Sequence, residues 1–116
     1  MERIVDRDFM PVLHTLIRDA VAGHGYGYAE GGDEFVCLLR NATVEMAEAF
    51  ANSLLEKIRS TSFAVEQQKE SVTASCGVAS VGEWGVAKVS DEANRAKREA
   101  KDAGKDRVKI SRPGPA

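Results

Sequence analysis

The sequence predicts an α/β fold, an α+β sandwich in which helices flank a mostly antiparallel sheet. Segments with apolar residues at helical spacing are separated by short apolar or alternating runs that are typical of strands. A Gly-Gly pair at residues 31–32 stands between two such runs and indicates a hairpin. The expected order is helix, hairpin, helix, strand, helix, strand. The 116 residues fit one domain, predicted over residues 1–110, with a tail over 111–116.

Three segments have the apolar spacing of helices. The first begins at Asp8 as N-cap, and Pro11 is tolerated because it falls in the first turn. The second begins at Thr43 as N-cap, ahead of an amphipathic stretch. The third is capped by residues 90–92 and closed by Gly104.

The predicted strands differ in their patterns. Residues 35–39 are continuously apolar, as expected for a strand covered on both faces. Residues 72–78 alternate between apolar and small side chains, so one face admits a close neighbour. Residues 62–66 are expected to form an edge strand, 67–70 a polar loop, and 107–110 a final strand.

Composition excludes several classes of function. The net charge of −2 gives no support for sequence-independent binding to nucleic acid. The two cysteines fall in predicted buried strands and are interpreted as small core residues of a reducing compartment. No signal peptide and no apolar run long enough for membrane insertion is present. The sequence therefore predicts a soluble, cytoplasmic protein.

The acidic turn of the hairpin is the candidate site. Asp33 and Glu34 lie at the tip, and the strand that follows them is anchored in the core. Because successive strand residues point to opposite faces, the two acids are expected to do different jobs. The alternative is an acidic turn that serves only fold and solubility. His14 and His24 have no partner at metal-binding spacing and are interpreted as structural or surface residues.

Three motifs stand in a recognisable order. Residues 31–35 read GGDEF, residues 72–79 read VTASCGVA, and residues 100–108 read AKDAGKDRV. In these motifs the chain resembles the GGDEF domains, the diguanylate cyclases that condense two GTP molecules into cyclic di-GMP. The resemblance covers roughly residues 8–110. It implies a palm-like nucleotidyl-cyclase sheet and a requirement for Mg²⁺ or Mn²⁺.

The resemblance assigns roles within the pentapeptide. It makes Glu34 a metal ligand and Asp33 the candidate catalytic base at the reacting hydroxyl. Gly31 and Gly32 would let the backbone approach the nucleotide closely. These roles suit the chemistry, because divalent metals neutralise the phosphates and magnesium needs only one or two carboxylates besides phosphate and water.

Two lysines match the family's phosphate-contacting positions. Lys101 and Lys105 lie four residues apart near the end of the last predicted helix, so both are expected to point the same way. The alternative is a solvated lysine face that complements the helix dipole.

The resemblance is weakest before the hairpin, where the family has a first strand ending in a metal-binding aspartate. Two alignments fit. In one, Asp8 opens the helix as a guanine contact and the first strand is absent. In the other, residues 4–9 are a shortened strand end and Asp6 is the second metal ligand. The first is favoured because only Ile4 and Val5 are apolar. The fold is then predicted to lack all or most of the first strand and helix, leaving an open sheet edge.

Further departures bear on activity. Ala22 and Gly25 replace the arginine and aspartate of the family's inhibitory site, Ala29 replaces a usual arginine, and Lys97 and Arg98 replace an apolar pair. The prediction is a GGDEF domain that is weak or inactive as a cyclase on its own. It would act as a nucleotide-sensing or protein-interaction module, binding GTP or cyclic di-GMP and docking as a homodimer or onto another protein through the open edge. The alternative is an active homodimeric cyclase with Mg²⁺.

Overall fold

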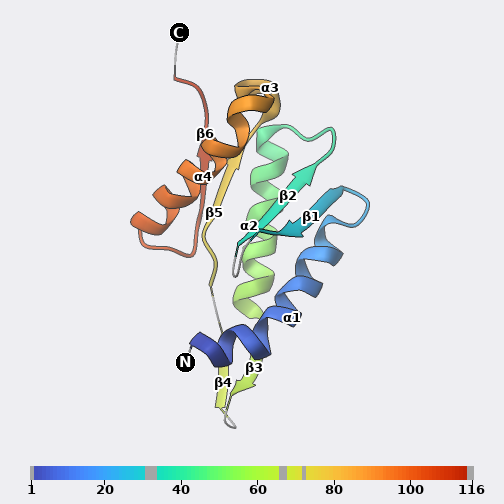
Figure 1. Ribbon diagram of the computed structural model, residues 1–116, viewed down its shortest axis with the longest axis vertical. Helices are drawn as coiled ribbons and strands as arrows, with labels where there is room; N and C mark the ends of the chain where they lie inside the picture. Colours follow the sequence, from blue (N-terminus) through green and yellow to red (C-terminus); the bar gives the residue numbers. More distant parts are fainter. Residues whose placement is uncertain (1, 31–33, 66–67, 72, 115–116) are drawn as a thin grey trace. The chain divides into compact units, whose positions relative to one another are not determined.

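The computed structural model describes residues 2–30, 34–65, 68–71 and 73–114, and the side chains of 11–30, 34–61 and 73–114 (Figure 1). The chain divides into two compact units, unit 1 (Met1–Asn41, Lys57–Val72) and unit 2 (Ala42–Glu56, Thr73–Ala116). The elements follow in the order α1 (Glu2–Val21), β1 (Gly25–Ala29), β2 (Phe35–Leu39), α2 (Val44–Ser60), β3 (Ser62–Val65), β4 (Gln68–Ser71), β5 (Cys76–Ala79), α3 (Val81–Trp84), α4 (Val86–Asp102) and β6 (Val108–Ser111).

Unit 1 is built on the packing of α1 against the β1–β2 hairpin. Ile17 and Val21, one helical turn apart, are buried on the face of α1 that meets β1. A Cβ atom added to Gly27 would lie only 3.2 Å from Cγ2 of Ile17 and 3.4 Å from Cγ2 of Val21. The helix therefore rests almost directly on the strand, and a glycine at this position permits it.

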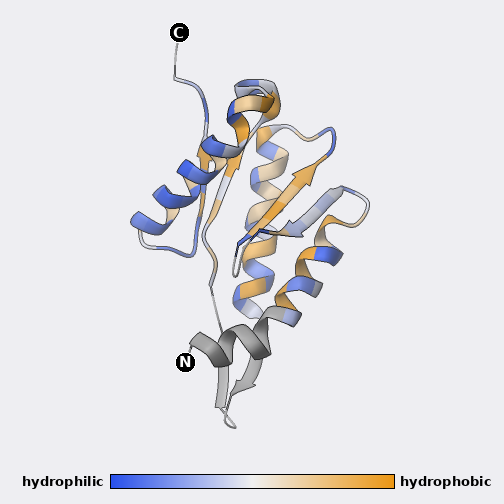
Figure 2. Ribbon diagram, viewed as in Figure 1, coloured by the Kyte–Doolittle hydropathy of each residue, from blue (hydrophilic) through white to orange (hydrophobic). Residues whose placement is uncertain are grey.

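The hairpin is antiparallel, with Gly25 opposite Leu39 and Ala29 opposite Phe35. At the open end of the hairpin, away from the turn, the amide of Arg40 donates a hydrogen bond to the carbonyl of His24 at 2.8 Å. The predicted hairpin is confirmed. Figure 2 shows β2 as an apolar strand beside a more polar β1. The hairpin face away from α1 exposes three large side chains, Tyr26 (65%), Tyr28 (50%) and Leu38 (53%).

Unit 2 is a helix packed on a parallel strand pair. β5 pairs with β6 in parallel, from Cys76 opposite Val108 to Ala79 opposite Ser111, and α4 lies against both strands. Strand β5 approaches α4 very closely at Gly77, because a Cβ atom there would overlap the carbonyl oxygen of Ala93 and the amide nitrogen of Lys97. The small face predicted for this strand is thus occupied by a helix. The apolar core joins the buried residues Val44, Ala51 and Val78 with Ala47, Cys76, Val108 and Ile110.

Two predicted helix caps are confirmed. The hydroxyl of Thr43 accepts the amide of Met46 at 3.1 Å, as an N-cap residue does. At the end of α4, Gly104 has φ +124°, and its amide donates to Lys101 O at 3.3 Å while the amide of Lys105 donates to Ala100 O at 2.9 Å. This pair of bonds is the Schellman arrangement that glycine favours at a helix end.

The start of α1 differs from the prediction. The helix begins at Glu2 rather than at Asp8, because no glycine or proline between Glu2 and Met10 interrupts it. Pro11 consequently lies inside the helix and not in its first turn. The alternative prediction, that residues 4–9 form a shortened strand end, is wrong, because the backbone of these residues is helical.

Four further boundaries also differ. The polar loop predicted at 67–70 is wrong, because β4 pairs antiparallel with β3 (Ser62 opposite Ser71). Helix α4 begins at Val86 rather than near residue 90, and the short helix α3 precedes it. Gly85, with φ +82°, separates the two helices. Strand β5 is shorter than predicted, and β6 ends one residue later.

Candidate functional site

The acidic turn lies between β1 and β2 in unit 1. The amide of Glu30 donates to the carbonyl of Glu34 at 2.7 Å, which closes the hairpin at this end. Glu34 is exposed, so its carboxylate is accessible to a ligand. Gly31, Gly32 and Asp33 lie outside the described residues, and their roles stay predictions.

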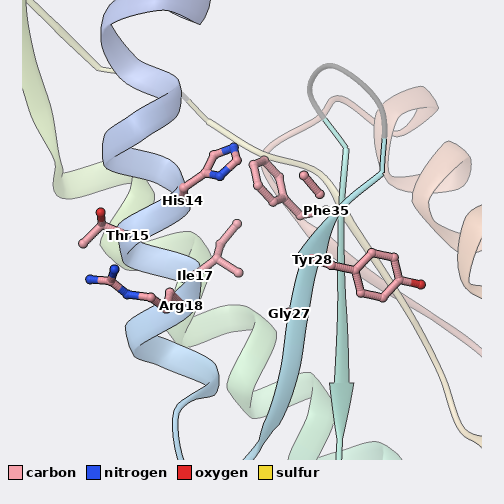
Figure 3. Close-up of a pocket in the computed structure, with 8 residues that line it drawn as sticks. His14, Thr15, Ile17, Arg18, Gly27, Tyr28 and Phe35 are labelled. Atoms are coloured by element: carbon pink, nitrogen blue, oxygen red, sulfur yellow. The ribbon is translucent and has the colours of Figure 1, made fainter.

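An aromatic contact supports the turn from α1. The rings of His14 and Phe35 meet edge to face, with centroids 4.9 Å apart and planes at 84°, and Figure 3 shows the imidazole directed at Phe35. His14 precedes Ile17 and Val21 by three and seven residues, so all three share one face of α1. His14 is an exposed residue that packs on Phe35, which agrees with its interpretation as a structural or surface residue.

A hollow of about 270 Å³ opens beside this contact. It lies between α1 and the hairpin (Figure 3). Its apolar lining comes from both elements and includes Ile17, Ala29 and Phe35. Arg18 stands at the rim, where it pairs with Asp19 at 3.4 Å, and both side chains are largely exposed. An ion pair so exposed contributes little.

The two lysines lie in unit 2. Lys101 is exposed in the last turn of α4, which ends at Asp102. Lys105 lies beyond the helix in a left-handed conformation, with φ +64°. The expectation that the two share a helix face is therefore wrong, although both side chains are exposed. Their predicted phosphate contacts remain a prediction.

The predicted metal ligands are only partly described. Asp6 and Asp8 lie on α1, and their side chains are outside the described part of the structure. Among the described residues, no group of three or more His, Cys, Asp or Glu is arranged to hold a metal ion. Glu34 nevertheless fits a metal that arrives with a nucleotide, because magnesium takes most of its ligands from phosphate and water.

A charged cluster in unit 2 was not foreseen from the sequence. Glu92 accepts hydrogen bonds from the Ser111 hydroxyl (2.7 Å) and from Arg95 (2.6 Å). Both bonds, that of Ser111 first, hold the pKa of Glu92 below its ordinary value. The bond to Glu92 raises the pKa of Arg95. Trp84 donates its indole N–H to the carbonyl of Ser111 at 2.9 Å, so it anchors α3 to the end of β6 within unit 2.

The residue after β6 is also tied down. Arg112 bonds Glu83 at 2.6 Å and Glu45 at 2.8 Å, and these two bonds raise its pKa. These contacts link α2, α3 and the end of β6 within unit 2. Nothing in the sequence pairs residues 67 positions apart, so only the structure reveals them. They stabilise the unit and offer no site for chemistry.

The cysteines offer no nucleophile either. Cys37 and Cys76 are half-buried and no disulfide joins them, as predicted. Burial raises the pKa of the Cys37 thiol, which keeps it protonated and unreactive. The acidic turn is left as the best candidate among the described residues.

A comparison with family models decides the family. The model described as "Diguanylate cyclase, GGDEF domain" matches residues 6–107, which is most of the chain and includes the acidic turn. The chain belongs to the GGDEF diguanylate cyclase family. The recognition made from the three sequence motifs is thereby confirmed. A comparison with curated protein sequences gave no match.

Solved structures agree with this GGDEF assignment. The active GGEEF domain of a diguanylate cyclase from Vibrio cholerae is similar at 25% identity and a TM-score of 0.74, covering 89% of this chain and 66% of that one. The GGDEF domain of DgcB from Caulobacter crescentus in complex with c-di-GMP is similar at 20% identity and a TM-score of 0.75. The match covers 84% of this chain and 60% of that one. A second DgcB structure, which adds a coiled coil, is covered over 54% of its length.

These likenesses confirm the predicted mixed α/β fold class. This chain spans less than two thirds of each of those chains. Of the helices that the structure describes, none has both the length and the apolar character needed to cross a membrane.

Proposed function

We propose that this GGDEF domain binds GTP with a divalent metal at its acidic turn and serves cyclic di-GMP signalling as a nucleotide-sensing or protein-interaction module. On this proposal residues 1–110 act as one partial domain that is weak or inactive as a cyclase by itself. The main observation in support of this proposal is the hydrogen bond that closes the hairpin at its turn. The bond from Glu30 to Glu34 presents an exposed carboxylate inside the segment that matches the family.

Each residue of the turn has a role in this proposal. Glu34 holds the metal, and Asp33 is the candidate base beside the reacting hydroxyl. Gly31 and Gly32 let the backbone approach the nucleotide, because they carry no Cβ atom. The bound metal would neutralise charge on the phosphates. Lys101 and Lys105, which match the family's phosphate-contacting positions, would supply positive charge to phosphate, as lysines commonly do.

Weak catalysis is favoured by the surroundings of the turn. Asp6, the other predicted metal ligand, lies on a helix rather than at a strand end, and Asp8, the predicted guanine contact, lies on the same helix. Ala29 leaves a hollow where the family usually has an arginine. A site without a strand-end aspartate can bind a metal–nucleotide complex more readily than it can align two nucleotides for reaction.

A second candidate is an active cyclase that works as a homodimer with Mg²⁺, each copy presenting one GTP. Its support is that both motif carboxylates are present and that the similar Vibrio cholerae domain is described as active. Docking to a partner protein has support in the exposed side chains of Tyr26, Tyr28 and Leu38 on one hairpin face. The DgcB structures contain c-di-GMP, so cyclic di-GMP is a second nucleotide to test.

The experiment compares wild type, Glu34→Gln and Glu30→Gln at high protein concentration with GTP and Mg²⁺ or Mn²⁺. Glu30 is the matched control, since it is an exposed acid of the same turn outside the pentapeptide. Thermal unfolding reports binding, because a ligand of the folded state raises the midpoint. Chromatography reports cyclic di-GMP.

The two readouts separate the candidates. The proposal expects a midpoint shift in wild type and Glu30→Gln, lost in Glu34→Gln, with little or no product. Product that disappears only in Glu34→Gln would establish the cyclase instead. Neither shift nor product in wild type would contradict both candidates and leave a docking module.

A further inference from the structure

A pair of rings joins α1 to the turn end of the hairpin. Phe35 is the first residue of β2 and directly follows Glu34. Its ring and that of His14 are nearly perpendicular, at a centroid distance of 4.9 Å. Consecutive Cα atoms are about 3.8 Å apart across a trans peptide, so a displacement of Phe35 is transmitted directly to Glu34.

The other contacts between α1 and the hairpin lie farther from the turn. Ile17 and Val21 pack on Gly27, which is two residues before Ala29, the partner of Phe35 across the hairpin. Ala29 contributes only a methyl group, and the hollow of about 270 Å³ borders it. The imidazole ring of His14 therefore contacts Phe35 next to an open hollow, where its removal would leave the phenyl ring room to move.

We infer that His14 is a positioning residue for the metal-binding turn, acting on Glu34 through Phe35. The inference depends on the proposed function for what Glu34 binds, but not for the position of the turn. In this role His14 supplies a flat ring to pack against rather than a proton or a metal ligand. A phenyl ring at this position would reproduce that contact, whereas a methyl group would not.

Hydrogen exchange at two amides tests the inference. The Glu30 amide closes the turn end of the hairpin, and the Arg40 amide closes its open end. Their exchange rates would be measured by NMR in wild type, His14→Ala and His14→Phe. Ile17→Val is the control, because it loosens the packing of α1 on Gly27 and keeps both rings in place in the sequence.

The expected result is local. An edge-to-face pair accounts for a change of up to about tenfold in local opening, so His14→Ala should speed exchange at Glu30 by about that factor and leave Arg40 unchanged. His14→Phe should restore the slow rate. Unchanged exchange at Glu30 in His14→Ala, or equal acceleration at both amides as Ile17→Val would produce, would overturn the inference.

Binding of Mn²⁺ with GTP, followed by electron paramagnetic resonance, adds a readout that a purely structural role would not change. The dissociation constant should rise several-fold in His14→Ala and return to the wild-type value in His14→Phe. Equal binding by wild type and His14→Ala would overturn the inference. Absence of binding in wild type would instead contradict the proposed function, and the exchange rates would still decide the role of His14.

Discussion

Each unit places a glycine against a helix, and the two contacts differ in kind. In unit 2 the backbone of α4 leaves Gly77 no room for a side chain, while in unit 1 Gly27 meets only the side chains of Ile17 and Val21. Unit 2 also pairs its charges, as Arg95 does with Glu92. Unit 1 instead exposes tyrosines on its hairpin and an acid at its turn.

We interpret unit 2 as a structural scaffold and the hairpin of unit 1 as the part that carries the candidate site. Ligand-binding segments come from the less stable parts of a protein, because they keep few buried contacts. The hairpin of unit 1 has this character, being packed on α1 through one face. In unit 2, the charged side chains of Glu92, Arg95 and Arg112 have partners within the unit. The following predictions test this contrast, beginning with the largest expected effect.

Among the substitutions considered, Gly77→Ala should lower the free energy of unfolding the most. The added Cβ overlaps the backbone of Ala93 and Lys97, so α4 must move, at a cost of about 3 kcal/mol in the free energy of unfolding. Urea unfolding followed by the fluorescence of Trp84, the single tryptophan, measures it. Gly82→Ala is the control, since its nearest neighbour is the Ser80 hydroxyl at 3.6 Å.

The matching change in unit 1 is Gly27→Ala. The side chains of Ile17 and Val21 can shift by the few tenths of an ångström that the new methyl group requires. We expect a loss of about 1 kcal/mol in the free energy of unfolding, measured by circular dichroism. A loss as large as that of Gly77→Ala would erase the distinction between the two units.

Trp84→Phe should also cost about 1 kcal/mol in the free energy of unfolding. The variant keeps most of the apolar ring but loses the indole donor to Ser111 O, which leaves a part-buried carbonyl unpaired. Circular dichroism in urea is the measurement, because the fluorophore is removed. Tyr28→Phe serves as control, since it removes a hydroxyl from the exposed hairpin face, and a change beyond about 0.5 kcal/mol there would be unexpected.

The smallest effect concerns pH. The pKa of Glu92 is lower in the folded chain because Ser111 and Arg95 donate hydrogen bonds to its carboxylate. The stabilisation is therefore complete above the ordinary glutamate pKa of about 4.3 and is lost as the pH falls through the lower folded value. The thermal midpoint of wild type should fall more steeply in acid than that of Glu92→Gln. Parallel curves would contradict this, and Asp91→Asn, on the same helix, is the control.

Local sequence chemistry predicted the parts of the fold that depend on neighbours in the chain. The hairpin follows from Gly-Gly between apolar runs, the start of α2 from the hydroxyl of Thr43, and the end of α4 from Gly104. β4 was missed because its residues are polar, and their strand arises from pairing with β3. Propensity cannot reveal a strand that a partner creates.

The site was predicted in its chemistry more than in its geometry. The pentapeptide identified Glu34, whose exposure the structure confirms. The shared direction of Lys101 and Lys105 was inferred from helical spacing, which does not apply because the helix ends at Asp102. The links from Ser111 to Glu92 and from Arg112 to Glu45 join distant residues. Such contacts depend on tertiary packing, which no local pattern contains.

Calorimetric titration of GTP with Mg²⁺ into wild type, Glu34→Gln and Glu30→Gln tests the central claim most directly. The account predicts binding by wild type and Glu30→Gln and an affinity at least about tenfold weaker in Glu34→Gln, because a charged ligand is lost. Equal affinity of Glu34→Gln and wild type would contradict the claim that the acidic turn is the nucleotide site.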